Sequence, residues 1–390
     1  MRALSDNQQA AFEKLRELKV GALFLGCGCG KTQTAVALIN SVDDVDLVLW
    51  VCPCQTKGNV AEELAKCGCR YPVEIVGVES IGQSGRIFSE VFEKVEKAKR
   101  AFMVCDESLK IKNGMAKRTK RMRELGKRCE YRLILNGTPI TKNVIDIYEQ
   151  MYFLSPKIMR GMSRNEFRDT YCRYRQVKKC GVTKEIQITG YSNIEHLLSI
   201  IDPYIYQCTL DLGLSRSYKR LHWRMGRERL EQYREYKESL FLDYSGDGLY
   251  DLLAVLAKLQ HSYCVEPEKF EVMGDLVDDR TLIFCKYIES RDELERRFPM
   301  AKVMTYGTGS LGLNLQQYRR IIYFDKTFDY AFREQSEARI YRMGQQDDCE
   351  YFDLTGNVGL ELMIDQCIDG KTSLVEHFKK GYRKELIREL

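Results

Sequence analysis

The sequence lacks the features of a membrane-spanning or secreted chain. Nowhere do about 18 apolar residues run together, as a membrane helix requires, and the N-terminal stretch MRALSDNQQAAFEKL holds no apolar core that would serve as a signal peptide. Low-complexity tracts and short-period repeats are absent too. With 44% hydrophobic and 30% charged residues, the composition is that of an ordinary folded protein with a sizeable core. We therefore expect no association with a membrane.

Excess charge is also missing. A net charge of only +5 excludes a chain that binds nucleic acid through overall basicity, so any binding surface must come from local clusters of lysine and arginine. Cysteine, by contrast, occurs 15 times, an odd number in a chain without a secretion signal. This indicates reduced thiols and a cytoplasmic protein, in the host cytoplasm if the chain is viral. Most of these thiols are expected in the core.

Short apolar runs alternate with helix-period segments in two parts of the chain. The first part holds VGALFL, VDLVLWV, AFMVC and YRLIL, and the second, after residue 280, holds TLIFC, AKVMTY, RIIYF and EYFDL. This alternation predicts an α/β fold with two parallel sheets covered by helices. The predicted domains are residues 1–155, a mostly helical insertion at 156–270, a second sheet domain at 271–358 and C-terminal helices at 359–390.

The predicted insertion contains a basic segment and a hairpin, YRQVKKCGVTKEIQIT. Basic side chains outnumber the nearby acids Glu166 and Asp169, and they are Arg160, Arg164, Arg168, Arg173, Arg175, Lys178, Lys179 and Lys184. A solvated helix face is the simpler interpretation. Interleaved tyrosines leave nucleic-acid binding open as the alternative. The candidate DNA contacts are Arg173, Arg175, Lys178 and Lys179.

The stretch LGCGCGKT lies between an apolar run and a helical pattern. Gly28 and Gly30 allow a sharp turn and a close approach to an anion, and the loop amides with the following helix N-terminus direct positive charge at phosphate. Lys31 would reach the β and γ phosphates of a nucleotide, and Thr32 would bind Mg²⁺. Leu25 stands where the full Walker spacing has glycine, so only the shorter G-x-G-K-T form is present.

The two cysteines of this stretch, Cys27 and Cys29, also admit a metal or redox interpretation. A metal would need further ligands, and the C-x-C pairs that start at Cys52 and Cys67 match no structural zinc spacing. The four histidines are scattered along the chain. We therefore interpret both cysteines as small residues at variable loop positions, with Cys29 a member of the ATP-binding loop.

The apolar run AFMVC ends in two adjacent acids, Asp106 and Glu107. An aspartate at the tip of a sheet strand can hold Mg²⁺ through water, and the neighbouring glutamate can orient and activate the attacking water. Because a phosphate loop precedes this strand on the same predicted sheet, we interpret the pair as catalytic.

The later stretch REQSEARIYRMGQ predicts a helix on which Gln335, Arg339 and Arg342 share one face. A nucleotide hydrolase divided over two domains needs cations that meet the γ-phosphate from the far side. Arg339 and Arg342 are therefore candidate catalytic residues, and Gln335 is a candidate ATP contact. An ordinary surface helix is the alternative.

Several of these segments together resemble the Swi/Snf-type ATPases of helicase superfamily two. Motifs II, III, V and VI of the family are matched in order by CDESLKIKN, YRLILNGTPITKNVIDIYEQMYFLSP, GSLGLNL and FDKTFDYAFREQSEARIYRMGQ. Motif I corresponds to LGCGCGKT, and motif IV resembles TLIFCKY. The similarity covers nearly the whole chain. It implies two RecA-like lobes with ATP and Mg²⁺ in the cleft between them, and ATP-driven movement along double-stranded DNA.

The resemblance also implies roles for single residues. Gln8 falls at the position of the adenine-reading glutamine. Four further residues match motifs that couple the nucleotide site to DNA, and they are Asn136, Thr138, Gly312 and Asn314. The stretch LTGNVGLELMIDQCIDGKTSL resembles the helix that braces the two lobes.

Two departures from the family pattern stand out. Ser108 and Leu109 replace the Ala-His that follows the two acids, and leucine cannot make the hydrogen bond expected of that histidine. Because Asp106 and Glu107 are present, we expect ATP hydrolysis to be retained. The departure instead affects the expected coupling of hydrolysis to DNA. Only about two dozen residues separate TLIFC from GSLGLNL, which indicates a compact motor of viral or prokaryotic type.

The leading hypothesis is a DNA-stimulated ATPase that translocates on double-stranded DNA. A strand-separating or branch-migrating helicase, acting on single-stranded or branched DNA, is the first alternative, because a fold alone does not decide between them. An ATP-gated DNA-binding clamp or scaffold with weak turnover is the second. The sequence leaves the protein partners unidentified.

Overall fold

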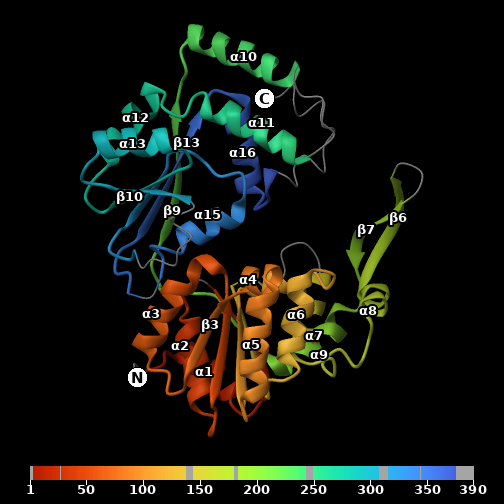
Figure 1. Cartoon of the computed structure of the whole chain (residues 1–390). Coiled ribbons are helices and arrows are strands. Elements are labelled where there is room, and N and C mark those ends of the chain that lie inside the picture. The colour runs from red at the N-terminus through yellow and green to blue at the C-terminus, as the bar shows by residue number, and fades with distance from the viewer. Residues whose placement is uncertain are drawn as a thin grey trace. The chain divides into compact units, whose positions relative to one another are not determined.

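The computed structural model describes residues 3–26, 28–137, 144–179, 183–242, 249–306, 315–342 and 344–374. The chain forms two compact units, unit 1 (Met1–Leu210) and unit 2 (Asp211–Leu390). Each unit is built around its own parallel sheet, as the alternating pattern predicts (Figure 1).

Unit 1 contains a six-stranded sheet in the order β3-β2-β4-β5-β1-β8, and all its described strand pairs are parallel. The strands are β1 (Val20–Leu25), β2 (Leu47–Cys52), β3 (Val73–Gly77), β4 (Ala101–Asp106), β5 (Tyr131–Asn136) and β8 (Ile205–Cys208). Because the strands are parallel, the carboxyl ends of β1, β4 and β5 meet at one edge of the sheet.

Helices cover both faces of this sheet. They are α1 (Asp6–Leu15), α2 (Lys31–Asn40), α3 (Lys57–Cys67), α4 (Val78–Gln83), α5 (Gly85–Lys97), α6 (Lys117–Gly126), α7 (Ile145–Leu154), α8 (Arg164–Tyr171) and α9 (Ile194–Ile201). Successive side chains of β1 point to opposite faces of the sheet and so contact different helices. Leu23 and Leu25 pack in the apolar cluster of α1 to α3. Ala22 and Phe24 pack in the apolar cluster of α4 to α9. Strands buried on both faces read as continuous apolar runs.

An antiparallel hairpin follows α8 in unit 1. Its strands are β6 (Cys172–Lys179) and β7 (Thr183–Tyr191), with an irregular register at Arg173 and Tyr174. The hairpin extends away from the body of unit 1 (Figure 1). The sequence pattern predicted this hairpin.

Unit 2 contains a five-stranded sheet in the order β11-β10-β12-β13-β9, again with parallel pairs throughout its described strands. The strands are β9 (Arg216–Trp223), β10 (Thr281–Cys285), β11 (Lys302–Thr305), β12 (Arg320–Tyr323) and β13 (Cys349–Gly356). The helices are α10 (Arg227–Leu242), α11 (Leu249–His261), α12 (Pro267–Met273), α13 (Ile288–Arg297), α15 (Tyr330–Glu337) and α16 (Gly359–Asp369).

The core of unit 2 encloses a charged network beside its apolar cluster. Lys326 is fully buried, and its Nζ lies 2.5 Å from Asp365 Oδ1 and 2.9 Å from Glu361 Oε2. Both carboxylates belong to α16, whose apolar side chains pack in the same core. The network therefore joins the segment after β12 to α16, because a buried charge is tolerated only when it is paired.

The segment predicted as an insertion, 156–270, is divided between the two units at residue 210. It supplies β8 to the first sheet, beside β1, and β9 to the second, beside β13. These boundaries differ from the predicted ones because neither strand carries a strong apolar signal. In β9, RSYKRLHW, the exposed edge position allows arginine, lysine and histidine within the strand.

Candidate active site

The loop between β1 and α2 contains two left-handed glycines. Gly28 has a φ of 84° and Gly30 a φ of 76°, a region that side chains other than glycine rarely adopt. A Cβ atom on Gly30 would lie 1.9 Å from Nε2 of Gln8. The backbone conformation at position 30 therefore favours glycine, and any larger residue would also displace the Gln8 side chain.

Gln8 of α1 holds this loop in place. Its side chain is buried, Nε2 donates to the carbonyl of Cys29 at 3.1 Å, and Oε1 accepts from the amide of Ser5 at 2.9 Å. Ser5 is the N-cap of α1, so one glutamine joins a helix start to the phosphate loop. Sequence reasoning placed Gln8 at the nucleotide but missed this anchoring contact. Adenine recognition by Gln8 stays a prediction.

Lys31 begins α2 and turns back toward the loop. Its Nζ donates to the carbonyl of Leu25, the last residue of β1, at 3.1 Å. The amide of Gly26 in turn donates to the carbonyl of Cys208 at the end of β8, at 2.9 Å. The loop thus spans the ends of two neighbouring strands, with an ammonium group and the first amides of a helix beside it. Such an arrangement can bind phosphate.

Cys29 is buried, and its side chain packs in the apolar cluster of α1 to α3 together with Cys52. Cys27 lies outside the described residues. Within the described ranges, one group of three metal-capable side chains comes together, in unit 2, and it consists of His261, Cys264 and Glu289. Cys29 is not part of it, and its position is that of a small core residue.

Asp106 ends β4, and Glu107 follows in a left-handed conformation, with a φ of 52°. A residue other than glycine in this region carries strain, which is typical of functional sites. The amide of Glu107 donates to Oδ1 of Asp106 at 2.9 Å. Burial raises the pKa of Asp106 to about 7, the charge of Glu107 adds to the increase, and the nearby ammonium group of Lys31 opposes it.

A third acidic residue, Glu63 of α3, reaches this site. Its Oε2 accepts a hydrogen bond from the hydroxyl of Thr32 at 2.8 Å, and its charge contributes to raising the pKa of Asp106. Hydroxyl and carboxylate oxygens are the hard ligands that Mg²⁺ prefers, so this donor set fits that ion. Sequence reasoning missed Glu63, because nothing in KGNVAEELAKC separates it from an ordinary helix-surface glutamate.

Ser108 links the acidic strand end to its neighbours. Its buried hydroxyl donates to Oε1 of Gln150 in α7 at 2.6 Å, and the side-chain amide of Asn136, at the end of β5, lies 3.5 Å from the same hydroxyl. Leu109 follows in a short 3₁₀ turn, Ser108–Ile111. The other predicted coupling residues, Thr138, Gly312 and Asn314, lie outside the described residues.

The predicted helix around Gln335 is shorter than expected. α15 ends at Glu337, so Arg339 and Arg342 lie in the turn after it and do not share a helical face with Gln335. The prediction of one continuous helix is therefore wrong. Ile340 and Tyr341 are both buried, and side-chain Nε2 of Gln345 binds the carbonyl of Ile340 at 3.1 Å. These tertiary contacts outweigh the helical pattern.

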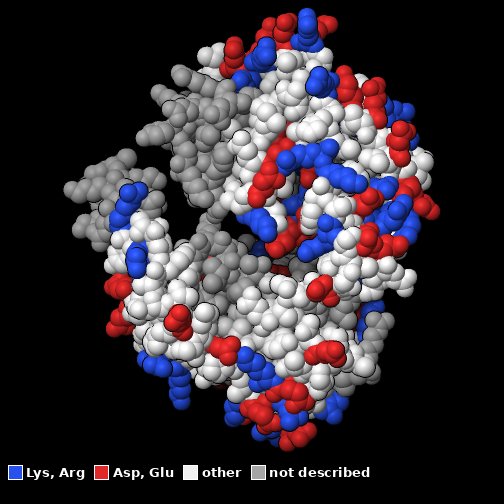
Figure 2. Space-filling model, turned by 180° about the vertical axis from the view of Figure 1, so that it is seen from behind, with Lys and Arg blue, Asp and Glu red and all other residues white. Residues whose placement is uncertain are grey.

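Some basic side chains near the hairpin pair with acids or rings in the described part of the structure. Arg168 pairs with Asp169 at 2.8 Å and packs over the ring of Tyr174. Arg173 and Arg175 are exposed on β6. Lys178 and Lys179 belong to the same strand by their backbone. On the face shown in Figure 2, lysine and arginine lie among aspartate and glutamate over both units.

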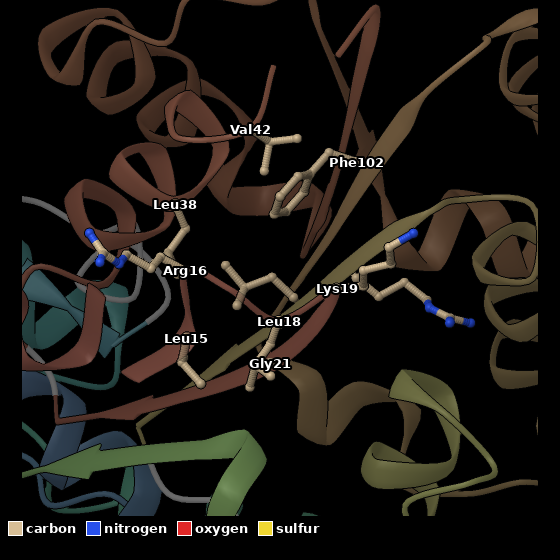
Figure 3. A pocket seen from close by; sticks show the side chains of 10 residues that line it. Leu15, Arg16, Leu18, Lys19, Gly21, Leu38, Val42 and Phe102 are labelled. Carbon is tan, nitrogen blue, oxygen red and sulfur yellow. The ribbon is translucent and has the colours of Figure 1, made fainter. Parts of the chain in front are cut away.

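A shallow hollow lies at the opposite, amino-terminal edge of the unit 1 sheet. Leu18, Gly21 and Phe102, near the starts of β1 and β4, line it together with Leu38 of α2. Figure 3 shows apolar side chains gathered around it, with the guanidinium of Arg16 extending away. This hollow lies at the opposite ends of β1 and β4 from the phosphate loop and the acids.

No helix in the described part of the chain is long and apolar enough to cross a membrane.

Comparisons with known proteins show what the whole chain is similar to. The chain is 27% identical over 186 residues to the Drosophila melanogaster SWI/SNF-related matrix-associated actin-dependent regulator of chromatin subfamily A-like protein 1, covering 45% of this chain and 23% of the relative. It is 22% identical to the DNA repair and recombination protein RDH54 of Saccharomyces cerevisiae, covering 79% of this chain and 40% of the relative. The chain thus spans less than half the length of these relatives.

A solved structure, the Sulfolobus solfataricus SWI2/SNF2 ATPase core in complex with dsDNA, is 22% identical, with 99% of this chain and 96% of that chain covered and a TM-score of 0.47. The family model described as SNF2-related domain matches residues 49–287, more than half of the sequence. This stretch begins within β2 and includes the acids at the end of β4 and the start of unit 2. The chain belongs to the SNF2-related domain family.

Proposed function

We propose that this protein is a DNA-stimulated ATPase that moves along double-stranded DNA. One observation carries the proposal: Lys31 and Thr32 at the start of α2 and Asp106 and Glu107 at the end of β4 belong to the same edge of one parallel sheet. This is the arrangement that phosphoryl transfer from ATP needs, with a phosphate-binding helix end beside paired carboxylates. Membership of the SNF2-related domain family supports double-stranded DNA as the polymer along which the protein moves.

In this proposal each residue of unit 1 has a separate task. The amides of the loop and the ammonium group of Lys31 bind the phosphates, and Lys31 exchanges the carbonyl of Leu25 for a phosphate oxygen. Thr32 and Asp106 would hold a magnesium ion, and such an ion would neutralise charge on the phosphates. Glu107 orients the attacking water and accepts its proton.

Unit 2 contributes the remaining groups. Arg339 and Arg342 supply cations to the phosphate from the opposite side, and Gln335 contacts the nucleotide. Nucleotide binding then changes how each unit holds the DNA backbone, and hydrolysis resets that grip. Contacts to phosphate, from Arg173, Arg175, Lys178 and Lys179 among others, would make DNA binding salt-dependent and tolerant of sequence.

A second candidate function is strand separation or branch migration. The projecting β6–β7 hairpin favours it, because such a hairpin on unit 1 is a candidate wedge between strands (Figure 1). Its exposed Arg173 and Tyr191 offer a charge and an aromatic surface for a displaced base.

Parallel measurements of ATP turnover test the proposal. Turnover is measured with duplex DNA, single-stranded DNA, forked DNA and RNA, and displacement of a triplex-forming strand reports movement on duplex. We expect the largest stimulation by duplex and triplex displacement that requires ATP. Stimulation by forked DNA with release of a strand would favour the second candidate. Turnover that no nucleic acid changes would contradict both.

A further inference from the structure

The contact between Thr32 and Glu63 has a chemical consequence for metal binding. The hydroxyl proton of Thr32 points at Oε2 of Glu63, 2.8 Å away. A hydroxyl group has one proton and two lone pairs. Since the proton is committed to Glu63, the lone pairs are left for another partner, and a metal ion takes lone pairs only.

Glu63 is also well placed to add charge to this site. It lies in α3, which packs beside α2, and its side chain is partly exposed. Its carboxylate interacts electrostatically with that of Asp106. The three oxygen-bearing side chains of Thr32, Glu63 and Asp106 thus come from three separate elements, α2, α3 and β4.

We propose that Glu63 is a positioning residue of the magnesium site. It accepts the proton of the Thr32 hydroxyl, turns the oxygen lone pairs toward the ion and strengthens that oxygen as a ligand through its own negative charge. This inference rests on the proposed function, because it assumes that the site binds Mg²⁺ with a nucleotide. Partners of this kind, one step from the metal, typically contribute about 10- to 100-fold to metal affinity.

The alternative is a hydrogen bond that only fastens α3 to α2. The two roles differ in what they need from residue 63. A fastening bond needs an acceptor, which the amide oxygen of glutamine retains in Glu63→Gln. A positioning role also needs the negative charge, which glutamine lacks. Glu62 offers a matched control, because it is the preceding residue on α3, is exposed and pairs with Lys66 at 3.8 Å.

The test measures metal binding without turnover. Binding of Mn²⁺ to the full-length protein with ADP is followed by electron paramagnetic resonance of free Mn²⁺, and binding of fluorescent ADP is measured in EDTA. We expect Glu63→Gln to weaken Mn²⁺ binding about tenfold, with ADP affinity in EDTA unchanged and Glu62→Gln like the wild type. Unchanged or tighter Mn²⁺ binding by Glu63→Gln would overturn the proposal.

A double-mutant cycle adds a second criterion. Thr32→Val removes the hydroxyl that Glu63 is proposed to orient, so Glu63→Gln should have a smaller effect in that background than alone. Fully additive effects would overturn the proposal, since Glu63 would then act without Thr32. Failure of the wild type itself to bind Mn²⁺ with ADP would overturn the nucleotide site and this inference together. Normal Mn²⁺ binding without DNA stimulation would affect the proposed function alone.

Discussion

The hydroxyl of Ser108 donates to Oε1 of Gln150 at 2.6 Å, and both side chains are buried. The side-chain amide of Asn136 approaches the same hydroxyl at 3.5 Å. One small residue therefore connects the acidic end of β4 with the end of β5 and with α7. In the family that the sequence resembles, a histidine at the position of Leu109 is expected to link the acids to the neighbouring motif. In this structure Ser108 makes hydrogen bonds to both neighbouring elements.

Replacing Ser108 by alanine should weaken coupling more than replacing Leu109 by alanine. Loss of a buried hydrogen bond should lower the free energy of unfolding by about 1–2 kcal/mol. We also expect a lower ratio of DNA-stimulated to basal ATP turnover, because the hydrogen-bonded link between the end of β5 and the acids of β4 is lost. Turnover with and without duplex DNA checks this. A wild-type ratio in Ser108→Ala would contradict a role of Ser108 in coupling.

Glu107→Gln should separate nucleotide binding from hydrolysis. Glutamine keeps the size of the side chain but does not accept the proton of the attacking water. We expect ATP and Mg²⁺ to bind with nearly unchanged affinity while turnover falls by about a thousandfold. Lys31→Ala serves as the contrasting variant, since it should weaken nucleotide binding as well. Near-normal turnover by Glu107→Gln would remove Glu107 from the mechanism.

The raised pKa of Asp106 predicts how stability depends on pH when no nucleotide or metal is present. The pKa is about 7 in the folded protein against 3.8 for the ordinary group, so the folded state favours the protonated form. Its stabilising contribution is present below pH 4 or so and is lost as the pH rises to about 7. Asp106→Asn should therefore be more stable than the wild type at pH 8, by about 1–2 kcal/mol after allowance for solvent screening.

Urea unfolding in EDTA at pH 5 and pH 8 measures this difference. The advantage of Asp106→Asn should be smaller at pH 5, where the wild-type carboxyl is still mostly protonated in the folded state. An advantage of equal size at both pH values would show that Asp106 titrates normally. The same variant should lose ATP turnover, which illustrates that a functional site is held at the expense of stability.

The sequence predicted those parts of the structure that depend on local pattern. The eight apolar runs correspond to β1, β2, β4, β5, β10, β11, β12 and β13. Apart from β11, which is an edge strand, they lie inside parallel sheets, where burial on both faces leaves a continuous apolar signal. β9 escaped prediction because an edge strand needs no such signal, and α15 was predicted too long because buried Ile340 and Tyr341 bend the chain into a turn.

The parts of the candidate site that the sequence missed are contacts between distant elements. Gln8 lies 21 residues before Cys29, and Thr32 lies 31 residues before Glu63. Neither pair has a spacing that marks it, because the contacts arise only when α1 and α3 pack beside the phosphate loop. A glycine loop and an acidic strand end, in contrast, each combine chemistry and backbone geometry within a few residues.

Cys29 and its neighbour Gly30 should respond very differently to alanine. Cys29 is a buried apolar side chain, so Cys29→Ala should keep ATP turnover within a few-fold, at a cost of about 1–2 kcal/mol in stability. In Gly30→Ala the new Cβ would collide with Gln8 and require a strained φ. We expect that variant to lose nucleotide binding. Metal analysis that found one zinc or iron per wild-type chain, lost in Cys29→Ala, would contradict the interpretation of Cys29.

Arg342 provides the test of the contribution of unit 2. Its amide binds the carbonyl of Ile340, and buried Ile340 and Tyr341 fix the turn that carries it. Arg342→Ala should therefore leave the backbone turn in place while it removes the cation. Nucleotide affinity should be nearly unchanged, because the phosphate loop and the acids belong to unit 1.

ATP turnover by Arg342→Ala should fall by about 10³-fold or more, as expected for an arginine that stabilises charge in phosphoryl transfer. Movement should fail with it, because hydrolysis is what resets the grip of the two units on DNA. Arg291→Ala is the matched control, since Arg291 is an exposed arginine of unit 2 that pairs with Asp292. Fluorescent-nucleotide binding, turnover and triplex displacement are measured for both variants. Unchanged displacement by Arg342→Ala would refute a mechanism in which both units act on one nucleotide.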